Sequence, residues 1–118
     1  MKPGNEADKV YLQHMLECIA RIAEYAGGDE QRFRESRLIQ DAVVRNLQTL
    51  AESSQRLSEP IKAGEPQIPW RAISGFRNIL VHDYLGIDVS AIWQVVAVEL
   101  APLQAALVRM ADTLSRRG

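Results

Sequence analysis

Apolar residues recur at intervals of three and four along most of this chain, and that spacing predicts helices. The first run extends from about residue 5 or 7 to residue 25. It ends at the glycine pair 27–28, because glycine readily takes the left-handed conformation that closes a helix. A second run covers about 36–57, with Ser36 as a suitable N-cap. The charged segment 29–35 between them is either a loop or a helical lead-in.

Prolines and glycines divide the second half of the chain. Residues 58–68 contain two prolines and one glycine, so we expect a loop that cannot continue a helix. A third long helix is predicted from Pro69 to Tyr84, since proline is tolerated at the start of a helix, and Gly86 stops it.

The last helix begins at Asp88 or Ser90, and its apolar positions continue to Leu114. Pro102 should kink or split it, because its ring removes a backbone donor and crowds the preceding turn. No stretch has the alternation of a strand. We therefore predict an all-α protein, an antiparallel bundle of four to five helices in a single domain over residues 1–118.

Composition is that of an ordinary globular protein, with 47% hydrophobic and 25% charged residues. The formal net charge of −1 supplies no general basic field, so any contact with RNA must come from a local patch. Cys18 is the only cysteine, which excludes an internal disulfide, and we expect it to be buried. No leader is evident and no segment approaches the length of a membrane span, so we expect a cytoplasmic protein without DNA or membrane partners.

The third predicted helix has two different faces. One is wholly apolar and is expected to face the core: Ala72, Ile73, Phe76, Ile79 and Leu80. The other mixes polar, charged and aromatic residues: Trp70, Ser74, Arg77, Asn78, Val81, His82 and Tyr84. Such a mixed face exposes an apolar patch beside a charged one, and an isologous homodimer is the simplest way to cover it.

Three side chains of the mixed face suit the binding of a phosphate. Arg77 offers a fixed cationic fork, Asn78 can donate to an oxygen, and His82 titrates near neutral pH and can move a proton. Asn78 and His82 are one helical turn apart, so the three groups converge. The simpler interpretation is a surface ion pair and a structural histidine. We expect no metal and no cofactor, because no cysteine or second histidine lies nearby in the sequence.

The string Arg77-Asn78-Ile79-Leu80-Val81-His82-Asp83-Tyr84, with Trp70 before it and residues 88–93 after it, resembles the HEPN superfamily and its HepT-like branch. Residues 40–47 with Ala51-Glu52 resemble the second helix of that family. The resemblance covers about residues 36–107. One difference is Ala51, where the family often has glycine.

This resemblance implies a metal-independent endoribonuclease that acts as a homodimer, with Arg77, Asn78 and His82 in a composite site. It also implies that the chain is the toxin of a toxin–antitoxin pair. The antitoxin would be a minimal nucleotidyltransferase that adenylylates Tyr84 and so silences the toxin. Alternatively, Tyr84 is a structural residue that closes the helix.

Three further positions could line the groove that contains Arg77 and His82: Asp41, Arg45 and Ser74. Asp41 and Arg45 are four residues apart, so they could instead pair with each other. His14 lies among polar neighbours and is expected at the surface. Two other functions stay open: a non-catalytic adaptor that binds a nucleotide or a nucleotidyltransferase partner, and a plain structural dimer. The sequence does not indicate which RNA would be cut.

Overall fold

A computed structural model describes the backbone of residues 3–81 and 88–117 and the side chains of residues 6–76 and 88–116. This part of the chain is helical and contains no strand, which confirms the all-α prediction. The long helices are α1 (Pro3–Ala26), α3 (Arg37–Arg56) and α7 (Leu100–Arg117). The shorter ones are α2 (Glu30–Glu35), α4 (Glu59–Ala63), α5 (Trp70–Val81) and α6 (Val89–Gln94), and a π-helical turn, η1 (Val95–Glu99), joins α6 to α7.

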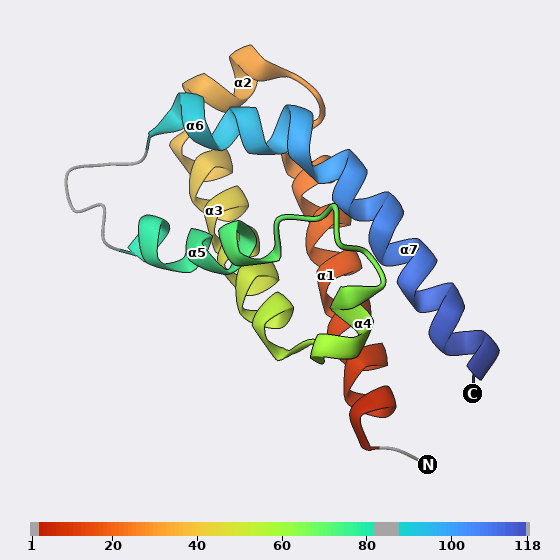
Figure 1. The fold of residues 1–118 in the computed structure, drawn as a ribbon. Helices are drawn as coiled ribbons and strands as arrows, with labels where there is room; N and C mark the ends of the chain where they lie inside the picture. Colours follow the sequence, from red (N-terminus) through yellow and green to blue (C-terminus); the bar gives the residue numbers. More distant parts are fainter. Residues whose placement is uncertain (1–2, 82–87, 118) are drawn as a thin grey trace.

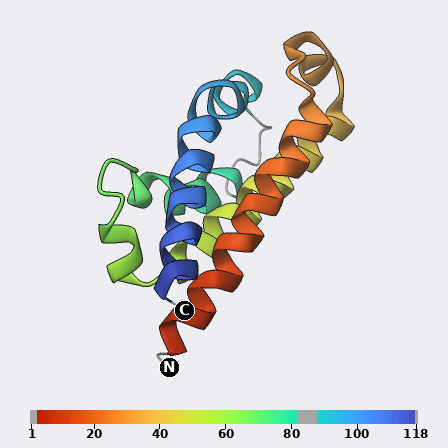
Figure 2. The same ribbon diagram turned by 90° about the vertical axis from the view of Figure 1, so that its right-hand side faces the viewer.

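Helix α1 lies at the centre of the arrangement and packs against both α3 and α7 (Figure 1). Helix α5 packs on α3, and α2 lies beside α6. Seen from the side, α1 and α7 run next to each other, with both termini at the same end of the molecule (Figure 2). The result is an elongated bundle in which α3 separates α1 from α5.

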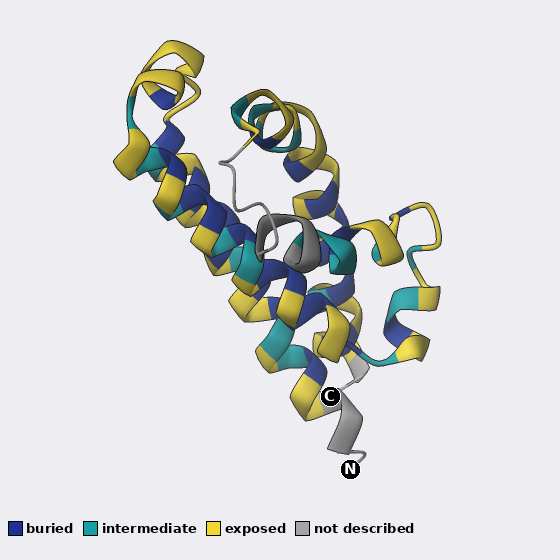
Figure 3. Cartoon of the chain, turned by 90° about the vertical axis from the view of Figure 1, so that its left-hand side faces the viewer, coloured by how far each residue is buried: buried dark blue, intermediate teal, exposed yellow. Residues whose placement is uncertain are grey.

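The core forms where the apolar stripes of the long helices meet, and buried residues line their inward sides (Figure 3). Its largest fully buried side chains come from four helices: Phe33, Leu12, Met15, Ile22, Leu47, Leu50, Leu107, Met110 and Leu114. Cys18 is buried, as predicted. Leu38, an apolar residue expected in the stripe of the second predicted helix, is instead 80% exposed in the first turn of α3.

The predicted ends of the first helices are confirmed. Gly27 and Gly28 both have positive φ angles, 59° and 68°. The Ser36 hydroxyl accepts a hydrogen bond from the Ile39 amide at 3.1 Å, so Ser36 caps α3. The charged segment before it is a helix, α2. Gln40 joins the two, because its side-chain amide donates to the carbonyls of Phe33 and Arg34 at the end of α2.

The prediction of an uninterrupted loop over 58–68 is wrong, since α4 forms within it. Proline is accepted in the first turn of α4, where its missing N–H costs nothing. A residue from the opposite end of the sequence supports this turn: the buried Asp8 carboxylate accepts from the Ser58 amide at 2.8 Å and from the Ser58 hydroxyl at 2.6 Å.

The last helix begins at the predicted cap, where Asp88 accepts from the Ala91 amide at 3.0 Å. Pro102 does not split it. Instead, the π-helical turn η1 precedes the proline, and the Leu100 amide donates to the Val95 carbonyl five residues earlier. The helical segment Val89–Arg116 is therefore continuous, and by length and composition it is long and apolar enough to cross a membrane. The expectation that no segment approaches that length is thus wrong, although one face of this helix packs into the core.

Candidate functional site

The start of α5 is tied to α7 through the segment before it. The Trp70 indole N–H donates to the Glu65 carbonyl at 3.2 Å, and the Glu65 carboxylate accepts two bonds from the Arg109 guanidinium, at 2.8 and 3.2 Å. Hydrogen bonds from Arg109 and then from Gln67 lower the pKa of Glu65 below its ordinary value. This ion pair holds the turn that places the first residue of α5.

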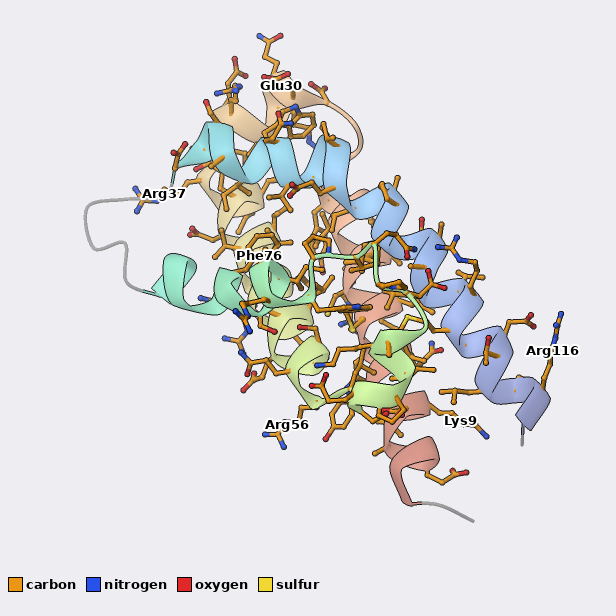
Figure 4. All side chains as sticks on the ribbon, in the orientation of Figure 1. Lys9, Glu30, Arg37, Arg56, Phe76 and Arg116 are labelled. Atoms are coloured by element: carbon orange, nitrogen blue, oxygen red, sulfur yellow. The ribbon has the colours of Figure 1, made fainter. Side chains whose placement is uncertain are left out.

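The middle of α5 rests on α3. Helices α3 and α5 are in extensive contact. Ile73 is buried and Phe76 is half-buried (Figure 4), and both line the space between α5 and the last helix. Ser74 is half-buried too: its hydroxyl lies 3.4 Å from the Ser54 hydroxyl, and its carbonyl accepts from the Gln55 amide at 3.4 Å. Ser74, placed on the mixed face from the sequence, is therefore part of the contact between α3 and α5.

The segment that begins at residue 88 is anchored independently of α5. The Arg34 guanidinium of α2 donates to the Ser90 hydroxyl at 3.1 Å, and the Phe33 ring packs against Trp93 with ring centroids 5.4 Å apart. Helix α2 thus positions α6. The helices on either side of residues 82–87 are both packed: α5 against α3, and α6 against α2.

The predicted catalytic residues are placed only in part. Arg77 and Asn78 belong to α5, and the structure describes their backbone but not their side chains. His82 and Tyr84 lie outside the described residues, as does the predicted end of the helix at Gly86. The prediction for these four residues therefore rests on the sequence, while the structure supplies the placement of the helix that carries the first two.

The exposed side of α3 carries the other two predicted groove residues. Asp41 and Arg45 are both exposed, and no ion pair joins them. The simpler prediction, that they pair with each other, is therefore wrong. At helical spacing Arg45 lies in line with Glu52 and Arg56, about 80° away from Gln55, which contacts α5. The described contacts of α5 therefore come from Ser54 and Gln55, not from Asp41 or Arg45.

An apolar groove of about 380 Å³ runs between α5 and the last helix. Its lining comes from three parts of the chain: Gln67, Ile68, Pro69, Ala72, Ile73, Phe76, Val95, Val98, Glu99, Leu100, Pro102 and Leu103. Ala72 was predicted to face the core, but it is exposed at the mouth of this groove, because α7 does not close over α5 there.

Val98, an apolar residue of the last helix, is 54% exposed, because at about 100° per residue it lies on the opposite side from Leu100 and Leu103. The sequence signals the π-helical turn through Pro102, whose missing N–H and ring require an adjustment one turn before it.

Among residues 6–76 and 88–116, no group of three or more histidine, cysteine, aspartate or glutamate side chains could hold a metal ion. The described polar groups that α5 shares with α3 are the hydroxyls of Ser54 and Ser74 and the side-chain amide of Gln55.

Comparison with known proteins assigns the class. The model of the family described as Ribonuclease HepT-like matches residues 15–110, which include α3, α5 and the whole of residues 77–84. The chain belongs to this family, and the resemblance seen in the sequence is confirmed at that level. The family match spans the α2–α6 contact, the apolar groove and the flank of α3.

Individual relatives agree with this assignment. The chain is 33% identical over 89 residues to "Putative RNase MJ1380" of Methanocaldococcus jannaschii, covering 75% of this chain and 82% of that protein. It is 32% identical over 99 residues to "Probable ribonuclease HepT" of Thermococcus cleftensis, covering 81% and 88%.

A third relative is longer. "Gamma-glutamylcyclotransferase and putative RNase MJ0434" of M. jannaschii is 31% identical over 109 residues, which cover 92% of this chain. The chain spans about half of that protein, 49% of its length. No solved structure matches the chain significantly.

Proposed function

We propose that this chain is a metal-independent endoribonuclease that acts as a homodimer and is the toxin of a toxin–antitoxin pair. Its membership of the Ribonuclease HepT-like family carries the proposal, because the match over residues 15–110 contains the Arg-x4-His pattern of Arg77 and His82. Arg77 lies in the last turns of α5, a helix anchored at its start to α7 and along its length to α3.

The reaction follows from the residue types. His82 takes the proton of a ribose 2′-hydroxyl, the 2′-oxygen attacks the adjacent phosphorus, and the bond from phosphorus to the 5′-oxygen breaks. The products are a 2′,3′-cyclic phosphate and a 5′-hydroxyl, which receives its proton from the second His82 of the dimer. Arg77 stabilises the negative charge that builds on the phosphoryl oxygens, and Asn78 orients the phosphate or the imidazole.

The groove between α5 and the last helix supports the homodimer. An open apolar groove exposes surface that a second copy would cover. A two-fold axis along the mixed face of α5 would bring two sets of Arg77 and His82 to one cleft. Exposed side chains on the α3 flank, Asp41 and Arg45, would then line the approach for RNA.

Regulation would act on Tyr84. A minimal nucleotidyltransferase would transfer an adenylyl group to its hydroxyl and release pyrophosphate from ATP. The added nucleotide is bulky and anionic, so close to Arg77 it would exclude the substrate phosphate by both size and charge. The expected setting is the cytoplasm, where both ATP and RNA are present.

The test is cleavage of a mixed RNA pool in excess chelator by purified protein that mass spectrometry shows to be unmodified at Tyr84. His82→Ala and Arg77→Ala should each lower the rate by about 10²- to 10⁴-fold, the usual loss when a general acid–base or charge-stabilising group is removed. Arg21→Ala is the control: it removes an exposed arginine from α1, outside α5, and should cut at the wild-type rate.

The opposite result is equally clear. Dimeric, unmodified wild-type protein that cuts no RNA would refute the nuclease proposal. Binding of a nucleotide or a nucleotidyltransferase that fails with Arg77→Ala would then identify the non-catalytic adaptor.

A further inference from the structure

A polar hollow of about 410 Å³ lies between α1 and α3, apart from the surface that α5 covers. It is lined by Tyr11 and His14 from α1 and by Thr49, Glu52, Ser53 and Arg56 from α3. Its volume is within the range of small-molecule sites. Ser54 contacts α5, whereas Ser53 lines the hollow, because neighbouring residues point about 100° apart around a helix.

The charged groups of this hollow are unengaged in the part of the chain that the structure describes. Glu52 and Arg56 are four residues apart in the favourable order, yet no ion pair joins them. The same spacing does give an ion pair in α2, where Arg34 meets Glu30 at 2.8 Å. Arg56 projects outward from the end of α3 (Figure 4). A cation and a carboxylate are thus both available to a ligand.

Two rings stand beside these charges. Tyr11 and His14 meet edge to face, with centroids 6.2 Å apart and planes 81° apart, so they form a corner rather than a stack. A flat base placed against one ring would meet the edge of the other. The half-buried Tyr11 is packed against the core and gives the corner a fixed wall, while His14 is exposed.

We propose that this α1–α3 hollow binds one nucleotide of a single-stranded RNA. Unstacked bases are recognised by aromatic side chains, and a phosphate by a free arginine fork. Glu52 can accept from the amino groups of a base or from a ribose hydroxyl, and the hydroxyls of Tyr11 and Ser53 can donate or accept. The inference rests on the proposed ribonuclease function: the hollow would hold the substrate strand away from the cutting site on α5.

The hollow also offers a way for a chain without a net positive charge to bind RNA. With a net charge of −1, the chain has no broad basic surface to attract RNA, so binding must come from a few specific contacts. A ring corner beside Arg56, which forms no ion pair among the described residues, is such a contact, because stacking is independent of net charge.

The experiment measures binding of a fluorescein-labelled, 12-nucleotide single-stranded RNA pool by anisotropy, with every variant built on His82→Ala to prevent cleavage. Tyr11→Leu should weaken binding about tenfold, the typical loss for one stacked base. Arg56→Gln should weaken it about three- to tenfold and reduce the salt slope by about 0.7, as expected for one lost phosphate contact. Arg21→Gln, an exposed arginine of α1 outside the hollow, should bind like its parent.

Equal binding by Arg56→Gln and Arg21→Gln, with the same salt slope, would overturn the proposal. So would a free nucleoside monophosphate that binds as tightly as the RNA, since the hollow would then be a mononucleotide site. Arg56 is exposed, so its variant should fold normally even if Tyr11→Leu does not.

Cleavage assays separate this inference from the proposed function. With His82 restored, Arg56→Gln should raise KM and leave kcat unchanged, because the hollow binds the strand without touching the reacting atoms. If wild-type protein cuts RNA while the hollow variants bind like the control, the inference falls and the nuclease stands. If the wild type cuts nothing but Arg56→Gln still weakens RNA binding, the hollow stands and the nuclease falls.

Discussion

The contact between Asp8 and Ser58 joins the first helix to the segment that leads into α5. The Asp8 side chain is 2% exposed and accepts two hydrogen bonds from one residue, at 2.8 and 2.6 Å. A hydrogen bond to a charged group contributes about 1.5–3 kcal/mol, so two give an upper bound of about 3–6 kcal/mol. Ser58 is half-buried and recovers part of this from water, so Asp8→Ala should cost about 2–3 kcal/mol.

The measurement is urea denaturation followed by circular dichroism, at one fixed protein concentration because a dimer would make stability depend on concentration. Asp8→Asn should cost about half as much, since its amide keeps one acceptor oxygen. Glu6→Ala is the matched control: it removes an exposed carboxylate from the same helix and should change stability by less than about 0.5 kcal/mol.

A double-mutant cycle decides whether the two residues act together. Ser58→Ala removes the 2.6 Å bond and leaves the amide bond, so Asp8→Ala and Ser58→Ala should couple by about 1 kcal/mol. Strict additivity, or an Asp8→Ala cost equal to that of Glu6→Ala, would refute the reasoning.

Two further predictions test the surroundings of α5. Arg109, and to a lesser degree Gln67, lower the pKa of Glu65. The ionised carboxylate therefore stabilises the fold at pH values above 4.5, the ordinary pKa of glutamate. This contribution is lost as the pH falls through the lowered pKa of the folded state. The difference in Tm between wild type and Glu65→Gln should therefore narrow on acidification below 4.5; a difference independent of pH contradicts this. Val98→Glu places a charge in the apolar groove, so it should weaken dimerisation at least about tenfold, measured by analytical ultracentrifugation. Val10→Glu, at a residue equally exposed on α1, should leave dimerisation unchanged. Equal dimerisation by the two variants would show that the groove is not the interface.

The sequence by itself determined the helices and most of their ends. Ser36 and Asp88 cap the helices that follow them, and the left-handed glycines at 27 and 28 end α1, because each depends on residues three or four positions away. The family, too, is evident from one short string ending at Tyr84. For the candidate site, the sequence alone selects Arg77, Asn78 and His82.

The tertiary structure decided those features that depend on contacts between residues far apart in the sequence. Helix α4 forms where prolines predict a loop, because Asp8 supports its first turn from fifty positions away. The lack of an ion pair between Asp41 and Arg45 could not be predicted either, since spacing permits such a pair without requiring it.

The groove beside α5 is the clearest case of this division. It lies where α7 does not close over α5, so Ala72 and Val98 are exposed along it. Apolar periodicity assigns Ala72 to the core, and only the packing of the two helices leaves it uncovered. Local chemistry chooses the helices, whereas the packing of one helix against another decides which apolar side chains stay exposed for a partner.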